Sequence, residues 1–403
     1  MKKKKLIGPF RQLLPLSDIS EKGPISDDQL GIVENAGIGV ADGHIVEVDH
    51  FEKMASSYNE IDEITEEVIG LPGFVDSHTH MVWGGSRARD YSLRMRGETY
   101  EKILEEGGGI FDSVEKTRVE SKENLIADFQ KRAARHLSSG VTTFEVKSGY
   151  GLDKEGEIKM LEVAKESDIR ADIITTCLAA HVCPKEFSDK AEYLNYVLEE
   201  ILPEVKKRGL ASRVDAFIEP SAFPVDVARD YLSRAKSMGF HLTVHADQFT
   251  TGGSELAVEL GAQSADHLEA TDENGVKALA ESNTVAVALP GASLGLGMQF
   301  TPARKLLDAG VSLAIATDWN PGSAPMGDLL TQAALLGIYE KLSTAEVFAG
   351  ITFRGAKALG FSDRGSLKNG MIADIVTFPT ADFREILYQQ GMMKPNRVWK
   401  GGL

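Results

Sequence analysis

The chain has 403 residues, of which 42% are hydrophobic, and its net charge at pH 7 is −16. This length and composition suffice for one large core with an accessory domain, and the acidity argues against nucleic acid or an anionic membrane as a partner. The two cysteines, Cys177 and Cys183, cannot build a disulfide framework, which is typical of a reducing cytosol. We expect a cytoplasmic protein, because no stretch is long and apolar enough to span a bilayer.

The N-terminal part of the chain is predicted to be rich in β-strands. Apolar residues recur in 36–40 and 44–48 on either side of Asp42-Gly43, which is the pattern of a hairpin with a tight turn. β-type segments return near the end of the chain, at 373–378. We expect the two terminal segments, 1–70 and 362–403, to pair as the halves of one small composite β-sandwich domain.

The middle of the chain, residues 71–361, alternates short apolar segments with amphipathic ones. Helices are predicted at 121–138, 155–166, 191–207 and 225–238. Strands are predicted at 141–147, 172–180, 214–219, 241–245, 262–267, 284–289 and 311–317. With one more strand ahead of residue 78, this alternation predicts an α/β fold, a (β/α)₈ TIM-like barrel.

The motif His78-Thr79-His80 follows the apolar run 68–76. Residues i and i+2 of a strand project to the same face, so both imidazoles can reach one metal ion. Neutral imidazole is a preferred ligand of zinc and iron. The active site of such a barrel lies at the carboxyl ends of its strands. The polar residues at the other strand ends are therefore candidates for the same site.

Polar side chains stand at the predicted carboxyl ends of most of the other strands. They are Lys147 and Tyr150 (second strand), His181 (third), Glu219 (fourth), His245 (fifth), His267 (sixth) and Asp318 (eighth). Any one of these histidines is most simply a hydrogen-bonded core residue, but the set predicts one shared site. The four histidines off this face are expected to be structural: His44, His50, His136 and His241.

Four of these residues make a plausible ligand set for one divalent ion: His78, His80, His245 and Asp318. Bound zinc lowers the pKa of a water from about 16 to about 7 and so gives a nucleophile at neutral pH. Asp318 is placed to accept the proton of this water and pass it to a leaving nitrogen. His267 would orient the water or stabilise the oxyanion.

A second metal ion would need a bridging ligand, and a carbamylated lysine is one candidate. Lys147 follows the second predicted strand, whereas the fourth strand ends at Glu219. We therefore expect one metal ion rather than two.

These motifs resemble the amidohydrolase superfamily and, within it, the imidazolonepropionase family, over almost the whole chain. The marks of the superfamily are 72–80 (PGFVDSHTH), His245, Asp318 and the tail 365–374. The narrower marks are 84–87, 107–110, 145–151, 180–181, 245–248, 264–268 and 317–323. The glycine-rich stretch 294–300 and the segment 388–393 depart from the family's pattern.

The resemblance implies metal-dependent hydrolysis of the ring C–N amide bond of 4-imidazolone-5-propanoate to N-formimidoyl-L-glutamate, a step of histidine degradation. It implies one zinc or iron ion on the four candidate ligands, and a homodimer. The residues that it implies for substrate and product are Arg87, Tyr150, His181, Gln248, Asn320, Gly322 and Ser323. The candidate catalytic groups are then Asp318, His267 and Gln248, and Arg87 suits the propionate because a guanidinium binds a carboxylate through two charged hydrogen bonds.

Two other interpretations stay open. Another mononuclear amidohydrolase, a deaminase or cyclic amidase acting on a different nitrogen heterocycle, would carry the same ligands. It differs in whether Arg87, Tyr150 and His181 converge on a pocket for a carboxylate. A non-catalytic scaffold barrel would be expected to lose ligands, and here all four candidates are present.

Overall fold

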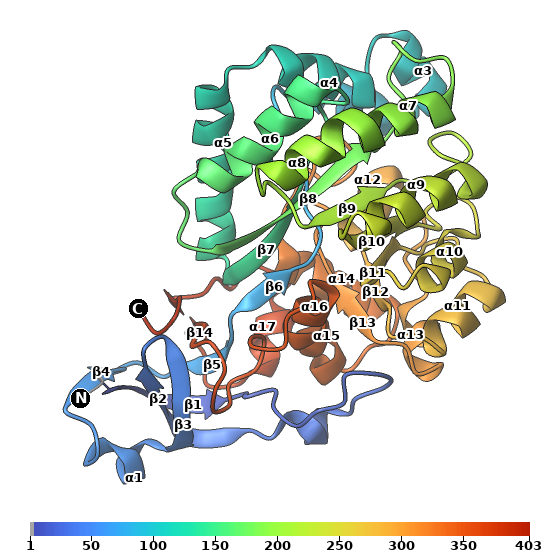
Figure 1. Cartoon of the computed structure of the whole chain (residues 1–403). Coiled ribbons are helices and arrows are strands. Elements are labelled where there is room, and N and C mark those ends of the chain that lie inside the picture. The colour runs from blue at the N-terminus through green and yellow to red at the C-terminus, as the bar shows by residue number, and fades with distance from the viewer. Residues whose placement is uncertain (1–3) are drawn as a thin grey trace.

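Eight parallel strands form the centre of the computed structural model, which describes residues 4–403 (Figure 1). They pair in chain order and are β6 (Phe74–Asp76), β7 (Val141–Lys147), β8 (Asp172–Ala180), β9 (Arg213–Ala216), β10 (His241–Ala246), β11 (Ser264–His267), β12 (Val285–Ala288) and β13 (Leu313–Ile315). The ring closes just beyond β6 and β13, where Thr79 bridges to Trp319 and the His80 amide donates to the Trp319 carbonyl at 2.9 Å. The predicted barrel is confirmed.

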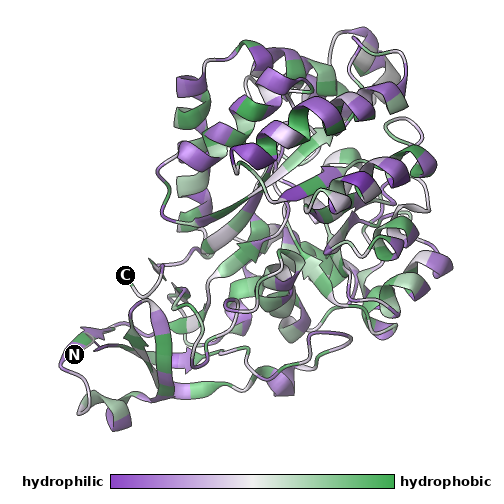
Figure 2. Cartoon of the chain, in the orientation of Figure 1, coloured by the Kyte–Doolittle hydropathy of each residue, from purple (hydrophilic) through white to green (hydrophobic). Residues whose placement is uncertain are grey.

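The predicted strands agree best with the structure at β7 and β8, the second and third strands of the barrel. β7 and β8 have the predicted bounds, and all seven residues of β7 are buried. A parallel barrel strand is covered on both faces, so it is continuously apolar apart from the residues that build a site. Figure 2 shows the central strands mainly in the hydrophobic colour, whereas the outer helices mix both colours.

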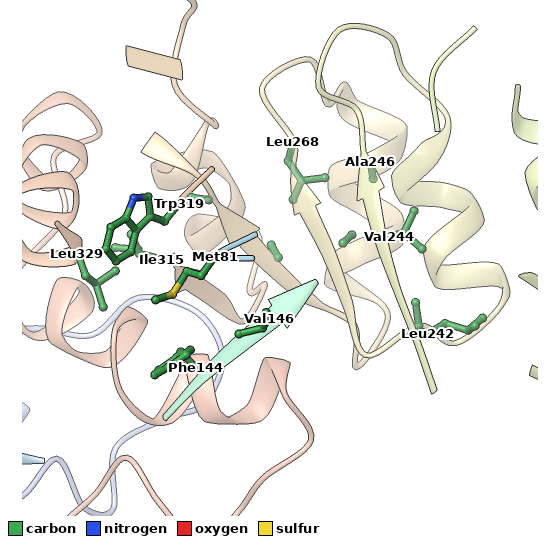
Figure 3. Close-up of a cluster of buried hydrophobic side chains, with 14 of the residues drawn as sticks. Met81, Phe144, Val146, Leu242, Val244, Ala246, Leu268, Ile315, Trp319 and Leu329 are labelled. Carbon is green, nitrogen blue, oxygen red and sulfur yellow. The ribbon is translucent and has the colours of Figure 1, made fainter. Parts of the chain in front are cut away.

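Alternation along these strands decides which side chains face the barrel interior. Figure 3 shows Phe144 and Val146 of β7 and Val244 of β10 in a buried apolar cluster that also includes side chains of the surrounding helices. Successive residues of a strand point to opposite faces. Lys147 and His245 therefore point inward, which brings the polar residues of different strands together.

The outer layer consists of the helices that follow the strands. They are α5 (Lys122–Ser138), α6 (Lys154–Glu166), α7 (Lys190–Tyr196), α8 (Leu202–Lys207), α9 (Val225–Ser237), α10 (Gly253–Glu259), α11 (Glu273–Ala280), α13 (Ala303–Asp308), α14 (Leu329–Tyr339), α15 (Thr344–Gly350) and α16 (Phe353–Ala358). The predicted helix 191–207 is interrupted by a π-helical turn, Val197–Ile201, between α7 and α8. Pro203 follows this turn and has no amide hydrogen to donate, which accounts for the looser register.

Two connections carry extra helices that approach the carboxyl ends of the strands. α2 (Ala88–Met95), α3 (Tyr100–Glu105) and α4 (Ile110–Val119) lie between β6 and α5, and α12 (Pro290–Leu296) follows β12. The triple glycine 107–109 leads into α4, with Gly109 at its N-cap in a left-handed conformation (φ +80°). The glycine-rich stretch 294–300 begins inside α12.

The two ends of the chain meet in a second, mixed sheet. Its strands are β1 (Lys4–Leu13), β2 (Val33–Ala41), β3 (His44–His50), β4 (Glu60–Glu63), β5 (Ile69–Pro72), β14 (Ile375–Phe378) and β15 (Arg397–Trp399). Their order is β15-β14-β5-β1-β2-β3, with β4 beside β1, so the antiparallel pair β14–β5 joins the C-terminal part to the N-terminal part. Three short helices accompany this part of the fold: a 3-10 turn (Asp27–Leu30), α1 (Phe51–Ala55) and α17 (Arg384–Tyr388).

Two sequence predictions about this sheet can be compared with it. The hairpin is confirmed, since β2 and β3 pair through Asp42 and Gly43, which both have positive φ as the tight turn requires. The apolar run 68–76 is divided at Gly73 between β5 of the mixed sheet and β6 of the barrel. A side chain at Gly73 would meet Thr142 Oγ1 at 2.3 Å, so the crossing point has room only for glycine.

None of the helices within residues 4–403 is both long enough and apolar enough to cross a bilayer.

Asp62 ties β4 to β15 and β1 in the mixed sheet. Its carboxylate accepts hydrogen bonds from Arg397 Nη2 (2.8 Å) and Trp399 Nε1 (3.0 Å) and pairs with Lys5 Nζ (3.0 Å). Burial acts to raise the pKa of Asp62, but these donors outweigh it and lower the pKa to about 2. A carboxyl with a depressed pKa stabilises the fold above its unfolded pKa, near 4, and loses this contribution as the pH falls towards 2.

We expect Asp62→Asn to lower the free energy of unfolding at pH 7 by about 1–2 kcal/mol. The difference from the wild type should shrink between about pH 4 and pH 2, where the wild-type carboxyl becomes protonated as well. Thermal unfolding of the wild type and the variant at several pH values from 7 down to 2 measures this difference in the free energy of unfolding. Asp382→Asn is the control, because its pair with Arg384 is exposed and should contribute little. A difference that stays constant down to pH 2 would contradict the ionic role of Asp62.

Candidate active site

A cavity of about 1380 Å³ opens at the carboxyl ends of the barrel strands. Sequence-predicted site residues line it, namely His80, Arg87, Tyr150, His181, His245, Gln248, His267, Asp318, Asn320, Gly322 and Ser323. His78 lies beside the cavity and is fully buried. The structure thus brings together all the predicted site residues, which come from widely separated parts of the chain.

The four predicted metal ligands meet at one point. Nε2 of His80 lies 3.2 Å from Nε2 of His78 and 3.4 Å from Nε2 of His245. Asp318 Oδ1 lies 3.5 Å from Nε2 of His78 and 3.3 Å from Nε2 of His80. Ligand atoms 2.0–2.1 Å from a tetrahedral zinc ion are roughly 3.4 Å apart, so these separations match the edges of such a site.

The protonation of the rings supports the same conclusion. His78 Nδ1 donates to Asp266 Oδ2 at 2.6 Å, and His245 Nδ1 donates to Asp215 Oδ2 at 2.9 Å. An ionised carboxylate only accepts hydrogen bonds, so each ring carries its hydrogen on Nδ1 and directs a lone pair from Nε2 towards the shared point. Lone pairs that face one another require a cation between them. This donor set fits a divalent metal ion.

Beneath the ligands, one buried lysine holds the carboxylates in place. Lys147 Nζ pairs with Asp215 at 2.7 Å, Glu145 at 2.8 Å and Asp266 at 3.5 Å, and all four side chains are fully buried. Burial acts to lower the pKa of Lys147, but the three carboxylates outweigh it and raise the pKa above its ordinary value. Carbamylation would put a fourth negative charge here, so the geometry agrees with an ammonium group.

Asp318 is held in an unusual backbone conformation, with φ at +51°. Asp76 fixes the preceding residue, since its carboxylate accepts from the amide and the hydroxyl of Thr317 at 2.9 and 2.6 Å. His136, one of the predicted structural histidines, donates to the same carboxylate at 2.9 Å. Burial acts to raise the pKa of Asp318, but the close approach of the His78 and His80 rings holds it well below the usual value. Asp318 is therefore an anion at neutral pH.

Arg87 is a cationic side chain that lines the cavity. Asp90 Oδ2 accepts a hydrogen bond from its Nε at 2.9 Å, and a side chain at Gly322 would lie 2.3 Å from Arg87 Nη1. Asp90 thus holds one edge of the guanidinium, and the Nη atoms are the donors that can reach a ligand. The side chain is 13% exposed, so a carboxylate bound there would be largely desolvated.

Two aromatic groups line the cavity beside the candidate ligand His80. The His181 ring stacks on the His80 ring with 5.4 Å between centroids, and Tyr150 lies 5.6 Å from His181. Burial lowers the pKa of His181 to about 3, so the ring is neutral. Its Nδ1 donates to the Gly149 carbonyl at 3.0 Å, which leaves Nε2 as an acceptor for a ligand N–H or O–H.

The segment 320–323 forms a tight turn closed by its own side chain. Asn320 Oδ1 accepts from the amides of Gly322 (2.7 Å) and Ser323 (2.8 Å). The amides of Gly322 and Ser323 are therefore used inside the turn. Ser323 Oγ donates to Asp318 Oδ2 at 3.4 Å, so this turn also positions the candidate catalytic carboxylate.

Sequence reasoning missed five acidic residues around the site: Asp90, Glu145, Asp215, Asp266 and Glu269. Glu145, Asp215 and Asp266 lie within strands whose residues are all buried, and an acidic residue inside a predicted buried strand was the available signal. Glu219, predicted to stand at the site, accepts from the amide of Phe249 at 2.8 Å and the hydroxyl of Thr250 at 2.6 Å. It supports the loop after β10 and lines the cavity.

Comparison with known proteins adds independent evidence. The profile of the amidohydrolase family matches residues 69–402. The imidazolonepropionase of Bacillus velezensis is 40% identical over 398 residues, which are 97% of this chain and 94% of that protein. The imidazolonepropionase of Clostridium tetani is 38% identical over 401 residues, which are 97% of this chain and 95% of that protein.

Solved structures share the fold at lower identity. A triazine hydrolase variant has a TM-score of 0.74 at 18% identity, and the match covers all of this chain and 94% of the hydrolase chain. An adenosine deaminase from Xanthomonas campestris with bound zinc has a TM-score of 0.70 at 21% identity, and the match covers 99% of this chain and 92% of the deaminase chain. This chain belongs to the amidohydrolase family and, within it, to the imidazolonepropionases.

Proposed function

We propose that the chain hydrolyses the ring C–N amide bond of 4-imidazolone-5-propanoate and releases N-formimidoyl-L-glutamate, a step of histidine degradation. The observation that carries this proposal is that a cationic side chain, Arg87, lines the same cavity as the candidate metal ligands His80, His245 and Asp318. The substrate is a cyclic amide with an anionic arm. A hydrolytic centre and a carboxylate receptor in one cavity suit both parts of it.

In this proposal the substrate is bound by its propionate and its ring. Arg87 holds the carboxylate through its Nη donors, while Asp90 keeps the guanidinium in place. His181 Nε2 accepts a ring N–H, and the Tyr150 hydroxyl lies near the same part of the cavity. Gln248, 7% exposed, lines the cavity as well and is assigned to the scissile side of the ring.

The metal ligands are proposed to be His78, His80, His245 and Asp318, with one zinc or iron ion per chain. When bound, such an ion makes a water acidic enough to attack near neutral pH and polarises the carbonyl. Asp318 Oδ1 lies against the histidines, so Oδ2 is the oxygen that can take a proton. It accepts the proton of the attacking water and returns it to the ring nitrogen as the C–N bond breaks. The ring carbonyl becomes the new α-carboxylate.

We further propose that the enzyme acts in the cytoplasm as a homodimer. The cellular location is supported by its two unpaired cysteines, Cys177 and Cys183. The proposed parts of the chain are residues 1–70 and 362–403 for the composite β domain and 71–361 for the barrel.

Incubation of the purified, metal-loaded protein with freshly made 4-imidazolone-5-propanoate tests the function directly. We expect N-formimidoyl-L-glutamate to accumulate, detected by mass spectrometry, because the cavity holds both a hydrolytic centre and a carboxylate receptor. Turnover of other nitrogen heterocycles with no reaction of this substrate would favour the alternative deaminase or cyclic amidase.

Removing two ligands tests the metal site. We expect the double variant His78→Ala/His80→Ala to lose its metal and its activity, because two of four donors are gone. Elemental analysis after dialysis against a weak chelator measures this loss. His44→Ala is the control: this exposed histidine in the mixed sheet should leave the metal content unchanged. Full occupancy in the double variant would show that these histidines do not hold the ion.

The carboxylate receptor is tested with Arg87→Met. A charged hydrogen bond contributes about 1.5–3 kcal/mol, so kcat/KM should fall by about 10–200-fold. For the wild type, kcat/KM should be lower by a similar factor with a substrate analogue that lacks the propionate. For Arg87→Met, kcat/KM should be almost the same with the substrate and with this analogue. Arg89→Met is the control, since Arg89 pairs with Glu106 on the surface and does not line the cavity. If the variant still discriminates against the analogue as the wild type does, Arg87 is not the receptor.

A further inference from the structure

A buried histidine and a buried glutamate face each other at the end of β11. His267 Nδ1 lies 3.5 Å from Glu269 Oε2, and the two side chains are 3% and 2% exposed. Within residues 4–403 neither atom has a hydrogen-bond partner. Leaving both unpaired is costly in a buried site, and a shift of a few tenths of an ångström makes them donor and acceptor.

The surrounding backbone is built to place this glutamate. His267 and Leu268 both have left-handed backbones, with φ at +82° and +70°. This reversal is strained for residues with a side chain, and it returns Glu269 towards the ring of His267. The other carboxylate oxygen, Oε1, accepts from Ser293 Oγ of α12 at 3.0 Å, which leaves Oε2 for the histidine.

The other ring nitrogen belongs to the active site. His267 lines the cavity, and one of its ring nitrogens lies within 4.8 Å of ligand nitrogens of His78 and His245. Because Nδ1 faces Glu269, Nε2 is the nitrogen available to the reacting groups. Its chemistry depends on the tautomer: with hydrogen on Nδ1 it accepts a hydrogen bond, and with hydrogen on Nε2 it donates one.

We propose that Glu269 is a positioning residue that fixes the hydrogen of His267 on Nδ1. This inference rests on the hydrolysis proposed above and assigns His267 one of its two possible tasks. The Nε2 lone pair accepts a hydrogen bond from the attacking water and orients it, whereas this tautomer has no hydrogen to donate to a developing oxyanion. Through Ser293, helix α12 also helps to position the side chain of Glu269.

The tautomer can be observed without any turnover. Long-range ¹H–¹⁵N correlation spectra of the zinc-loaded enzyme, labelled with ¹⁵N-histidine, distinguish a protonated ring nitrogen from an unprotonated one. Loss of signals in His267→Asn identifies the ring. We expect hydrogen on Nδ1 and a lone pair on Nε2 in the wild type. Hydrogen on Nε2, in either a neutral or a doubly protonated ring, would overturn the proposal.

The matching variant is Glu269→Gln, which keeps the shape and removes the charge. Ser293 donates to one position of the side chain and so favours the amide oxygen there, which turns the NH₂ group towards His267 Nδ1. The ring should then carry its hydrogen on Nε2. We expect kcat to fall by roughly 10²–10⁴-fold, with KM changed less than about threefold and the zinc retained.

Two comparisons make this result specific. Glu269→Asp keeps the charge and should retain the wild-type tautomer. Glu219→Gln removes a different buried carboxylate that lines the cavity and should leave the His267 tautomer unchanged. An unchanged kcat in Glu269→Gln, or loss of its zinc, would overturn the proposal. If the wild type fails to hydrolyse the imidazolone, the proposed function is wrong, while the wild-type spectrum still decides the role of Glu269.

Discussion

The buried ammonium group of Lys147 is the interaction on which the site depends. Three carboxylates converge on it inside the barrel. Without this cation, Asp215 and Asp266 would be like charges in a medium of low dielectric constant, which costs several kcal/mol per ion. The same two carboxylates accept the Nδ1 hydrogens of His245 and His78. One buried ion cluster therefore determines which nitrogen the rings of His78 and His245 direct towards the site.

The barrel closes where the site is built. β6 and β13 are short, and the contact between the first and last strands continues beyond both of them. The Asp318 amide donates to the His78 carbonyl at 3.0 Å, and the His80 amide donates to the Trp319 carbonyl at 2.9 Å. Three of the four candidate ligands are thus fixed by the closing hydrogen bonds of the scaffold, which is a more rigid support than a free loop.

The predictable part of the structure is the part that follows strand periodicity. The bounds of β7 and β8 could be predicted to the residue from their runs of β-branched and apolar residues, and alternation located the histidines at the strand ends. Glu269 was missed because its position depends on two left-handed residues, His267 and Leu268, and nothing in their side chains signals such a turn. The contact of Ser293 with Glu269 could not be predicted from the sequence either, because the two residues are 24 positions apart in the chain.

The pairing of β5 with β14 has a consequence for synthesis on the ribosome. Some 300 residues separate the two strands, as the register pairs Ile69 with Phe378 and Pro72 with Ile375. During translation the edge of β5 stays open until the whole barrel has been made, and open strand edges can pair with other chains. The mixed sheet is thus completed late, and a nascent chain is most exposed to aggregation through its earliest-made strands.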